Sequence, residues 1–398
     1  NVTFKIMVLV WKDYYSITKR LLIFCGLWPY QEKRIRLFRV SSLTLIILSL
    51  MVPQVAQFFH CDGNSRCIKL TIPMFILMIS FLVKLYTFQF NSSKIQSLTD
   101  HMCDDWKKLN SAEEYEIMKK YATNARLITV VYLIYVFISS WGFVLISFMP
   151  KLLNIVLPLN ESRPINMPYY AYYFVDEEKY YFYILIHMFV FGTMAIIVEV
   201  THDCTFFIYI EHVCSLFAVA GEESVETKLY MLVPMEFHYH TFRIISDALQ
   251  LRLLYGEINE MLRYLASILA QVIHTFCFSI QGQRLIDHSL QLNDKIYNSS
   301  WYEIPAESRK LLLFVMRRNT QPCFLSAGKI YVFSLKSFST VNVIYQIYVT
   351  TCFFEIFLKN TGIYFKGNAV FGFVFYCTCI LPMINDQYII WIVFVQPQ

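Results

Sequence analysis

Charged residues are scarce in this sequence: Asp, Glu, Lys and Arg make up 16% of its 398 residues, against about 25% in an average soluble protein. Glycine and proline are also few, with 11 and 12 residues, which excludes collagen-like and low-complexity chains. Low charge combined with 17% aromatic residues excludes intrinsic disorder. The formal net charge of +5 is thinly spread, so no nucleic-acid partner is expected.

Apolar residues are correspondingly abundant. They make up 57% of the chain, with 35 Phe and 28 Tyr among them. A soluble fold of this size cannot hide so much apolar surface, because its exposed shell must stay mostly polar. The composition therefore predicts an all-α polytopic membrane protein, with the lipid bilayer as one of its partners.

Five long stretches between charged residues reach the length of about 20 residues that a helix needs to cross a bilayer. They are Val40–Cys61, Leu70–Phe90, Leu127–Pro150, Tyr180–Val198 and Tyr264–Gln283. Lys84 interrupts the second stretch, and we expect its ammonium group to snorkel to the membrane surface. The last stretch is more polar, with Gln271 and His274. Segment 91–126 carries charges of both signs and predicts a solvated helix, whereas the Pro- and Tyr-rich Lys151–Lys179 predicts a structured loop.

The distribution of Lys and Arg predicts the orientation. The arm before the first span is rich in both, as are the loops on the same side, which predicts a cytoplasmic N-terminus. Five spans would leave everything after Gln283 outside, yet Arg284–Lys336 is again basic. Either the span count or the sequence is therefore one helix short. Residue 1 is Asn, so we expect the reading frame to begin upstream, and no secretory signal is visible in the basic N-terminal arm.

Cysteines and other reactive residues give weak signals. Cys61 and Cys67 lie close together in a short polar loop, and a disulfide between them requires that this loop be extracellular. The sequence leaves the bridged and free states open. His238 and His240 lack a nearby cysteine pair, so they do not predict a metal site. Triad-like triplets such as His202–Cys204 carry no weight, because catalytic triads meet in space rather than in sequence. We expect no enzyme activity, metal or cofactor.

Specific motifs follow the fifth stretch. They are Gly282-Gln283-Arg284-Leu285, Trp301-Tyr302-Glu303-Ile304-Pro305, the segment Arg309–Arg318, and Gly328-Lys329-Ile330 running on to Phe338-Ser339-Thr340-Val341. With these motifs the chain closely resembles the insect odorant receptors. Leu27-Trp28-Pro29 and Glu211-His212-Val213-Cys214 are similar as well. The resemblance implies seven helices, and it implies the same cytoplasmic N-terminus that the charge count predicts. It further implies a tuning subunit of an odour-gated cation channel, a tetramer formed with a shared coreceptor subunit in the plasma membrane.

Two departures from that family stand out. The helix that the family has before Tyr264 is absent, because Met261 passes almost directly into Arg263, and restoring it would complete the topology. The resemblance also stops at Val341, before the final half-helix that lines the pore in the family. We therefore expect an odorant-receptor-like transmembrane domain at residues 1–341. We expect the atypical hydrophobic tail at residues 342–398 to be a gene-model artefact.

The resemblance places an odorant pocket in the outer half of the bundle. Apolar walls with a few polar groups suit a small volatile ligand held by shape and dispersion. One face of the third span offers such walls, as do parts of the second and fourth. His187 is the strongest candidate, since a polar group at that depth should face the bundle interior. For each residue, helix packing or lipid contact is the alternative. The predicted ligand-binding residues are Met78, Phe81, Phe137, Ser140, Trp141, Val144, Tyr183 and His187.

Two other receptor or carrier classes can be weighed against the channel. A G-protein-coupled-type chemoreceptor is the main alternative, but the chain lacks an Asp/Glu-Arg-Tyr triplet after the third span and an Asn-Pro-x-x-Tyr motif near the last. A secondary transporter predicts inverted repeats, and none is visible. The sequence therefore favours an odorant-gated channel subunit.

Overall fold

The structure is a computed structural model and describes residues 10–109, 111–156, 167–219, 258–299, 301–303, 305–306, 309–310, 313, 316–317, 322–327 and 331–340. Its helices are α2 (Ser16–Cys25), α3 (Lys33–His60), α4 (Ser65–Phe90), α5 (Ser92–Lys108), α6 (Ala112–Val156), α7 (Glu177–Val219) and α9 (Ile258–Tyr297). Two short strands, β1 (Ser326–Ala327) and β2 (Tyr331–Val332), pair antiparallel, with Ser326 opposite Val332.

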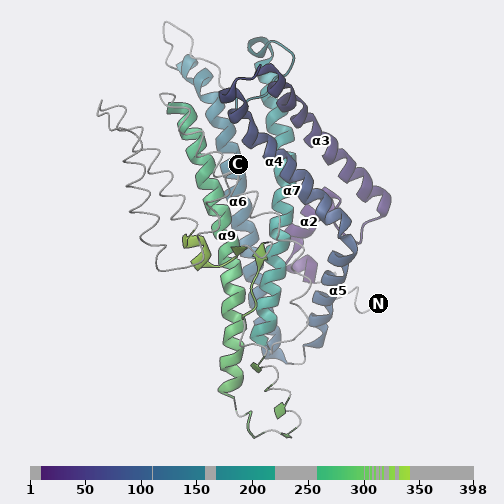
Figure 1. Ribbon diagram of the computed structural model, residues 1–398. Coiled ribbons are helices and arrows are strands. Elements are labelled where there is room, and N and C mark those ends of the chain that lie inside the picture. The colour runs from purple at the N-terminus through teal and green to yellow at the C-terminus, as the bar shows by residue number, and fades with distance from the viewer. Residues whose placement is uncertain are drawn as a thin grey trace, which may run out of the picture.

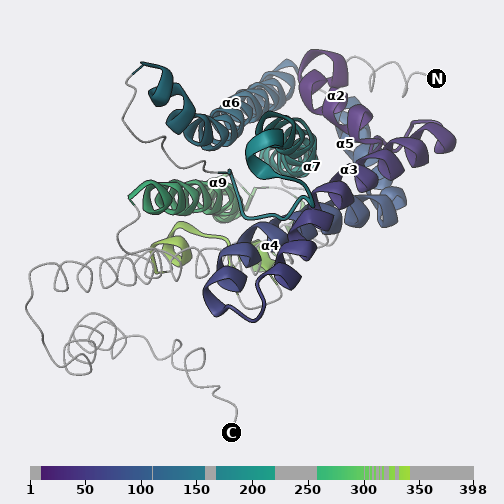
Figure 2. The same ribbon diagram turned by 90° about the horizontal axis from the view of Figure 1, so that it is seen from above.

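Helix α7 is the centre of the bundle. It packs against α2, α3, α4, α6 and α9, which surround it in the view from above in Figure 2. Along the molecule α6, α7 and α9 lie side by side (Figure 1). Every residue of α7 from Val200 to Ser215 is buried, as expected for a helix with neighbours on all sides.

The outer surface of the bundle is apolar. Among the described residues, the helices α3, α4, α6, α7 and α9 are each long and apolar enough to cross a membrane. Side chains spaced three or four residues apart on α6 share one exposed face, which a water-soluble protein would bury. This confirms the predicted all-α membrane bundle, and each predicted span coincides with one of these helices, the first extending one residue past the end of α3. The exposed face of α6 carries Leu127, Val131, Ile134, Ile138, Leu145 and Leu152.

Polar side chains fix where three of the helices begin. The Asn64 side chain accepts hydrogen bonds from the first backbone N–H groups of α4, and Asp176 does the same for α7. Ser111 and Glu114 form a reciprocal pair at the start of α6, with the Glu114 N–H 3.1 Å from Ser111 Oγ. These caps satisfy N–H groups that have no partner within the helix.

Charged residues bound the predicted apolar spans but do not end the helices. Glu199 closes the fourth predicted span, yet α7 continues to Val219. The prediction that Lys84 snorkels is wrong: it is buried, and its Nζ lies 3.0 Å from an Asp203 oxygen and 3.5 Å from a Glu199 oxygen. Partners within the bundle remove the need to reach water. Segment 91–126 is likewise not simply solvated, because α5 buries one apolar face that includes Trp106.

The two departures from the family pattern fall largely outside the described residues. The junction between Met261 and Arg263 lies inside α9, which is continuous from Ile258. Residues 220–257 and the tail at 342–398 are not described. The division of the chain at Val341 therefore stays a prediction.

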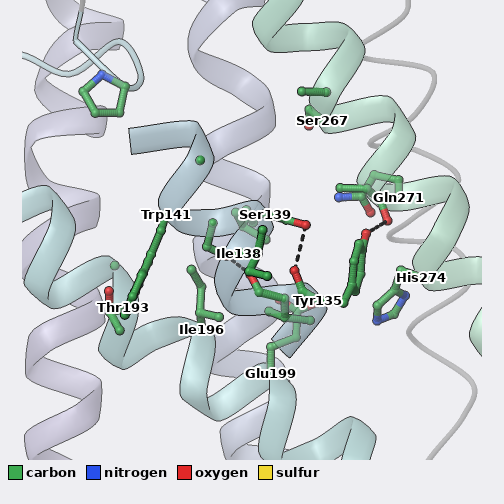
Figure 3. A pocket seen from close by; sticks show the side chains of 18 of the residues that line it. Tyr135, Ile138, Ser139, Trp141, Thr193, Ile196, Glu199, Ser267, Gln271 and His274 are labelled. Atoms are coloured by element: carbon green, nitrogen blue, oxygen red, sulfur yellow. Dashed lines mark hydrogen bonds between the residues drawn. The ribbon is translucent and has the colours of Figure 1, made fainter. Parts of the chain in front are cut away.

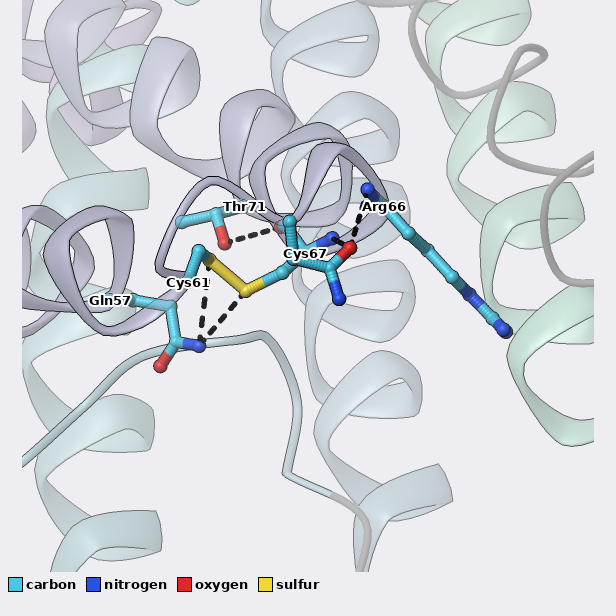
Figure 4. The surroundings of a disulfide bond; sticks show 6 residues. Gln57, Cys61, Arg66, Cys67 and Thr71 are labelled. Atoms are coloured by element: carbon cyan, nitrogen blue, oxygen red, sulfur yellow. Dashed lines mark hydrogen bonds between the residues drawn. A yellow bond between two sulfur atoms is a disulfide. The ribbon is translucent and has the colours of Figure 1, made fainter.

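The turn between α3 and α4 is closed by a disulfide. Cys61 and Cys67 are bonded, with their Cα atoms 5.6 Å apart (Figure 4). The side-chain amide of Gln57 donates to Cys67 Sγ at 3.4 Å. The sequence left the bridged and free states open, and the structure has the bridged one.

Candidate functional site

An apolar cavity of about 580 Å³ lies between α4, α6, α7 and α9. Its volume falls within the range of roughly 300–1,000 Å³ that is usual for small-molecule sites. Aliphatic and thioether side chains from α4 and α7 share the walls with aromatic rings. The rings belong to Phe81, Tyr132, Tyr135, Trp141, Tyr169 and Phe189.

One end of the cavity is covered by the segment that precedes α7, through Pro168 and Tyr169. This segment is fastened to α3 at two points. The backbone N–H of Tyr172 donates to the carbonyl of Pro53 at 2.9 Å, and the Tyr172 ring stacks on His60 at 4.4 Å between centroids. Pro53 lies inside α3, and its carbonyl oxygen has two lone pairs, so it can accept this bond in addition to one within its helix.

The opposite end of the cavity is polar. In Figure 3 the side chains of Ser267, Gln271 and His274 line the α9 wall, across from Trp141, and Glu199 lies below them. Helix α7 places Glu199 eleven residues, about three turns, beyond the Met188 that packs near the covered end. The cavity therefore has an apolar body and one polar end.

A buried cluster of charged groups adjoins that polar end, centred on Asp203, which is 0% exposed. The Asp203 carboxylate accepts hydrogen bonds from Lys84 Nζ at 3.0 Å and from the Tyr132 hydroxyl, and it pairs with His274 Nε2 at 3.0 Å. These partners come from α4, α6 and α9, so one carboxylate on α7 connects four helices. A buried charge without such partners would be costly.

The same cluster resembles a metal-ligand set. Ligand atoms of Glu199, Asp203 and His274 lie within 4.8 Å of one another. However, the Lys84 ammonium is 3.5 Å from Glu199 and 3.0 Å from Asp203. A side-chain cation therefore already occupies the place between the two carboxylates, and the cluster is an ion-pair network.

Half of the predicted ligand-binding residues come together in the cavity. Met78, Phe81, Ser140 and Trp141 all line it. Phe137 is half-buried and packs on Trp141 with ring centroids 6.1 Å apart, but it is not among the lining residues. The side chain of Val144 lies outside the described residues.

The two predicted residues on α7 lie away from the cavity. Tyr183 is 73% exposed. His187 Nδ1 is hydrogen-bonded to the Tyr173 hydroxyl at 2.9 Å, and its Nε2 lies 3.4 Å from Ser49 Oγ on α3. Burial raises the pKa of Tyr173 to about 12, so this phenol stays protonated at neutral pH. His187 is therefore satisfied by its neighbours, and its contact with a ligand stays a prediction.

The sequence did not single out the polar end of the cavity. From the sequence we expect Glu199 to end a span and Lys84 to snorkel. Two signals were available: Glu199 and Asp203 are four residues apart, hence on one helical face, and a lysine within an apolar span needs a partner. Their meeting depends on the packing of α4 against α7, which no local pattern reveals.

Several known proteins are similar to this chain. The family model described as 7tm odorant receptor matches residues 69–223 and 248–345. The chain belongs to the odorant receptor family. Odorant receptors are non-enzymatic, so this multi-pass membrane protein is a receptor rather than an enzyme. Curated relatives from Drosophila melanogaster and Anopheles gambiae, the latter named odorant receptor Or2, match over 84 residues at 26% and 30% identity. The chain spans about a fifth of the length of each, 20% and 21%.

Solved structures extend the likeness to the whole fold. The insect olfactory receptor OR5 from Machilis hrabei in complex with eugenol has a TM-score of 0.65 at 12% identity, covering 86% of this chain and 99% of that one. A second structure of OR5 gives the same TM-score at 13% identity, over 85% and 97% of the two chains. At this identity the match shows the odorant receptor fold.

Proposed function

We propose that the chain is an odorant-binding subunit of a ligand-gated cation channel in the plasma membrane, assembled with a coreceptor subunit as a tetramer. The observation that carries this proposal is the apolar cavity with one polar end inside an odorant receptor bundle. A small volatile molecule gains from dispersion contacts and from loss of water contact in such a space. The eugenol complex of OR5 supports a ligand site within this fold.

A ligand in the cavity would contact side chains that connect the surrounding helices. Tyr132 and His274 both line the cavity and both contact Asp203. A ligand that favours one arrangement of these side chains would shift the relative positions of α6, α7 and α9 by its differential affinity. This supports gating through the cluster.

A large side chain in place of Gly192 should fill part of the cavity and weaken the odorant response. Gly192 lines the cavity, and a Cβ added there would have no atom within 4 Å. Gly192→Ala should therefore be tolerated, whereas Gly192→Leu should reduce odorant sensitivity about tenfold or more by occupying ligand space. The measurement is current from cells that co-express the chain with a coreceptor, during a panel of volatile alcohols, esters, phenols and amines.

The matched control is Ile186→Leu, at a position on the same helix that is 57% exposed and does not line the cavity; its response should equal that of the unaltered chain. Equal sensitivity of the Gly192→Leu variant and the unaltered receptor would contradict the cavity as the odorant site. A response that disappears when G-protein turnover is blocked would favour the G-protein-coupled alternative.

We also propose that the N-terminus is cytoplasmic and that the α3–α4 turn faces outward, where a disulfide persists. A membrane-impermeant maleimide applied to intact cells should label Cys61 and Cys67 only after an impermeant reductant opens the bridge. The buried Cys25 and Cys103 should stay unlabelled until the cells are lysed and the protein is denatured. If the two cysteines are labelled only in permeabilised cells, the orientation is the reverse of the one proposed.

A further inference from the structure

Glu199 gives the cavity a negative end. Among the described residues that line the cavity it is the one carboxylate, and no Lys or Arg lines it. Its side chain is 14% exposed, and Lys84 Nζ lies farther from its carboxylate, at 3.5 Å, than from that of Asp203, at 3.0 Å. The ammonium of Lys84 is therefore held mainly by the other carboxylate.

The two carboxylates of the cluster share one lysine. Glu199 and Asp203 both pair with the ammonium of Lys84, which lies closer to Asp203. A charge in apolar surroundings interacts strongly, because little water screens it. A cationic ligand group beside Glu199 would give this carboxylate a second partner.

The rest of the cavity suits an aromatic body. The rings of Tyr132, Tyr135 and Trp141 line the cavity together with Glu199, and aromatic faces attract cations as well as other rings. We propose that this receptor selects small aromatic primary amines, whose ammonium donates to the Glu199 carboxylate while the ring packs among these side chains. This inference rests on the proposed function, since it takes the cavity as the ligand site.

Matched ligands test the proposal. 2-Phenylethylamine, 2-phenylethanol, ethylbenzene and phenylacetate share one skeleton and differ in the terminal group. Binding is measured as the ligand-induced rise in melting temperature of the purified receptor, and activation as current with the coreceptor. The amine should bind most tightly and phenylacetate least. Glu199→Gln should weaken amine binding by roughly 10- to 100-fold, the usual worth of a hydrogen bond to a charged group, and leave binding of the alcohol nearly unchanged.

Two further variants separate charge from folding. Glu199→Asp keeps the carboxylate and should keep the preference for the amine over the alcohol. Glu178→Gln makes the same chemical change at an exposed position in the first turn of α7 and should bind all four compounds like the unaltered chain. Retained binding of 2-phenylethanol by Glu199→Gln shows that the variant is folded.

The outcomes distinguish the two proposals. If the alcohol and hydrocarbon bind but the amine has no advantage, or if Glu199→Gln leaves its advantage intact, the amine selectivity is wrong and the odorant site stands. If phenylacetate binds best, the charge argument is wrong. If no volatile compound of any class binds or evokes current, the proposed function fails and this inference with it.

Discussion

Replacing Asp203 with Asn should strongly destabilise the fold of this receptor. The substitution removes the carboxylate charge that holds Lys84 at 3.0 Å, and the Glu199 carboxylate is farther from the buried ammonium, at 3.5 Å. Breaking a buried ion pair by removing one partner typically costs about 3–5 kcal/mol, because the remaining charge is uncompensated. We expect a marked fall in the melting temperature of the purified chain and little receptor at the cell surface.

A double variant distinguishes the ion pair from a general packing defect. Adding Lys84→Met to Asp203→Asn removes the stranded charge and should recover part of the lost stability, since a buried pair replaced by apolar groups is often close to neutral. Asp294→Asn, an exposed Asp near the end of α9, is the control and should melt like the unaltered chain. A single variant as stable as the unaltered chain, or a double variant no better than the single, would contradict the network.

Gly282→Ala should detach the segment that carries β2 from α9. A Cβ at this position would lie 2.1 Å from the Phe333 carbonyl oxygen and 2.6 Å from its Cβ. Neither atom can move by a change of rotamer, so the backbone must shift. Phe333 is buried and packs edge-on against Tyr331 at 5.2 Å, and the neighbouring Leu335 N–H donates to Gln283 Oε1 at 3.2 Å. Overpacking of this kind costs roughly 1–3 kcal/mol.

The expected results are a lower melting temperature and faster proteolytic cleavage within residues 322–340, located by mass spectrometry. Gly142→Ala is the matched control, because its added Cβ has no atom within 4 Å and Ala favours a helix by about 1 kcal/mol over Gly. It should keep or raise the melting temperature. An unchanged cleavage rate in Gly282→Ala would show that the close approach to Phe333 is not required.

Gly282 belongs to a motif whose physical role could not be derived from the sequence. The run Gly282-Gln283-Arg284-Leu285 carried the resemblance to the odorant receptors. In the structure three residues of this motif each make a specific contact. Gly282 admits Phe333, Gln283 accepts from Leu335, and Arg284 Nη2 pairs with a Glu211 carboxylate oxygen at 2.9 Å. The motif therefore holds together α7, α9 and the β2 segment.

The sequence by itself determined the architecture of the membrane helices, because crossing lipid demands long apolar runs and the chain has few charges with which to interrupt them. Spans such as Val40–Cys61 could be drawn from the spacing of charges alone, and the positions of Met78, Phe81, Ser140 and Trp141 on helical faces led to the cavity. Helix periodicity is a local property, so it survives without knowledge of the neighbours.

Tertiary packing alone decided which polar groups meet. Lys84 and Asp203 are 119 residues apart, and Asp203 and His274 are 71 apart, so no local pattern could pair them. We expect His187 from the sequence to face a ligand in the bundle interior, but Tyr173 and Ser49 are its neighbours, and it is not among the residues that line the cavity. The energy of a polar group in lipid depends on its partners rather than on its position in a helix, and those partners exist only once the helices have assembled.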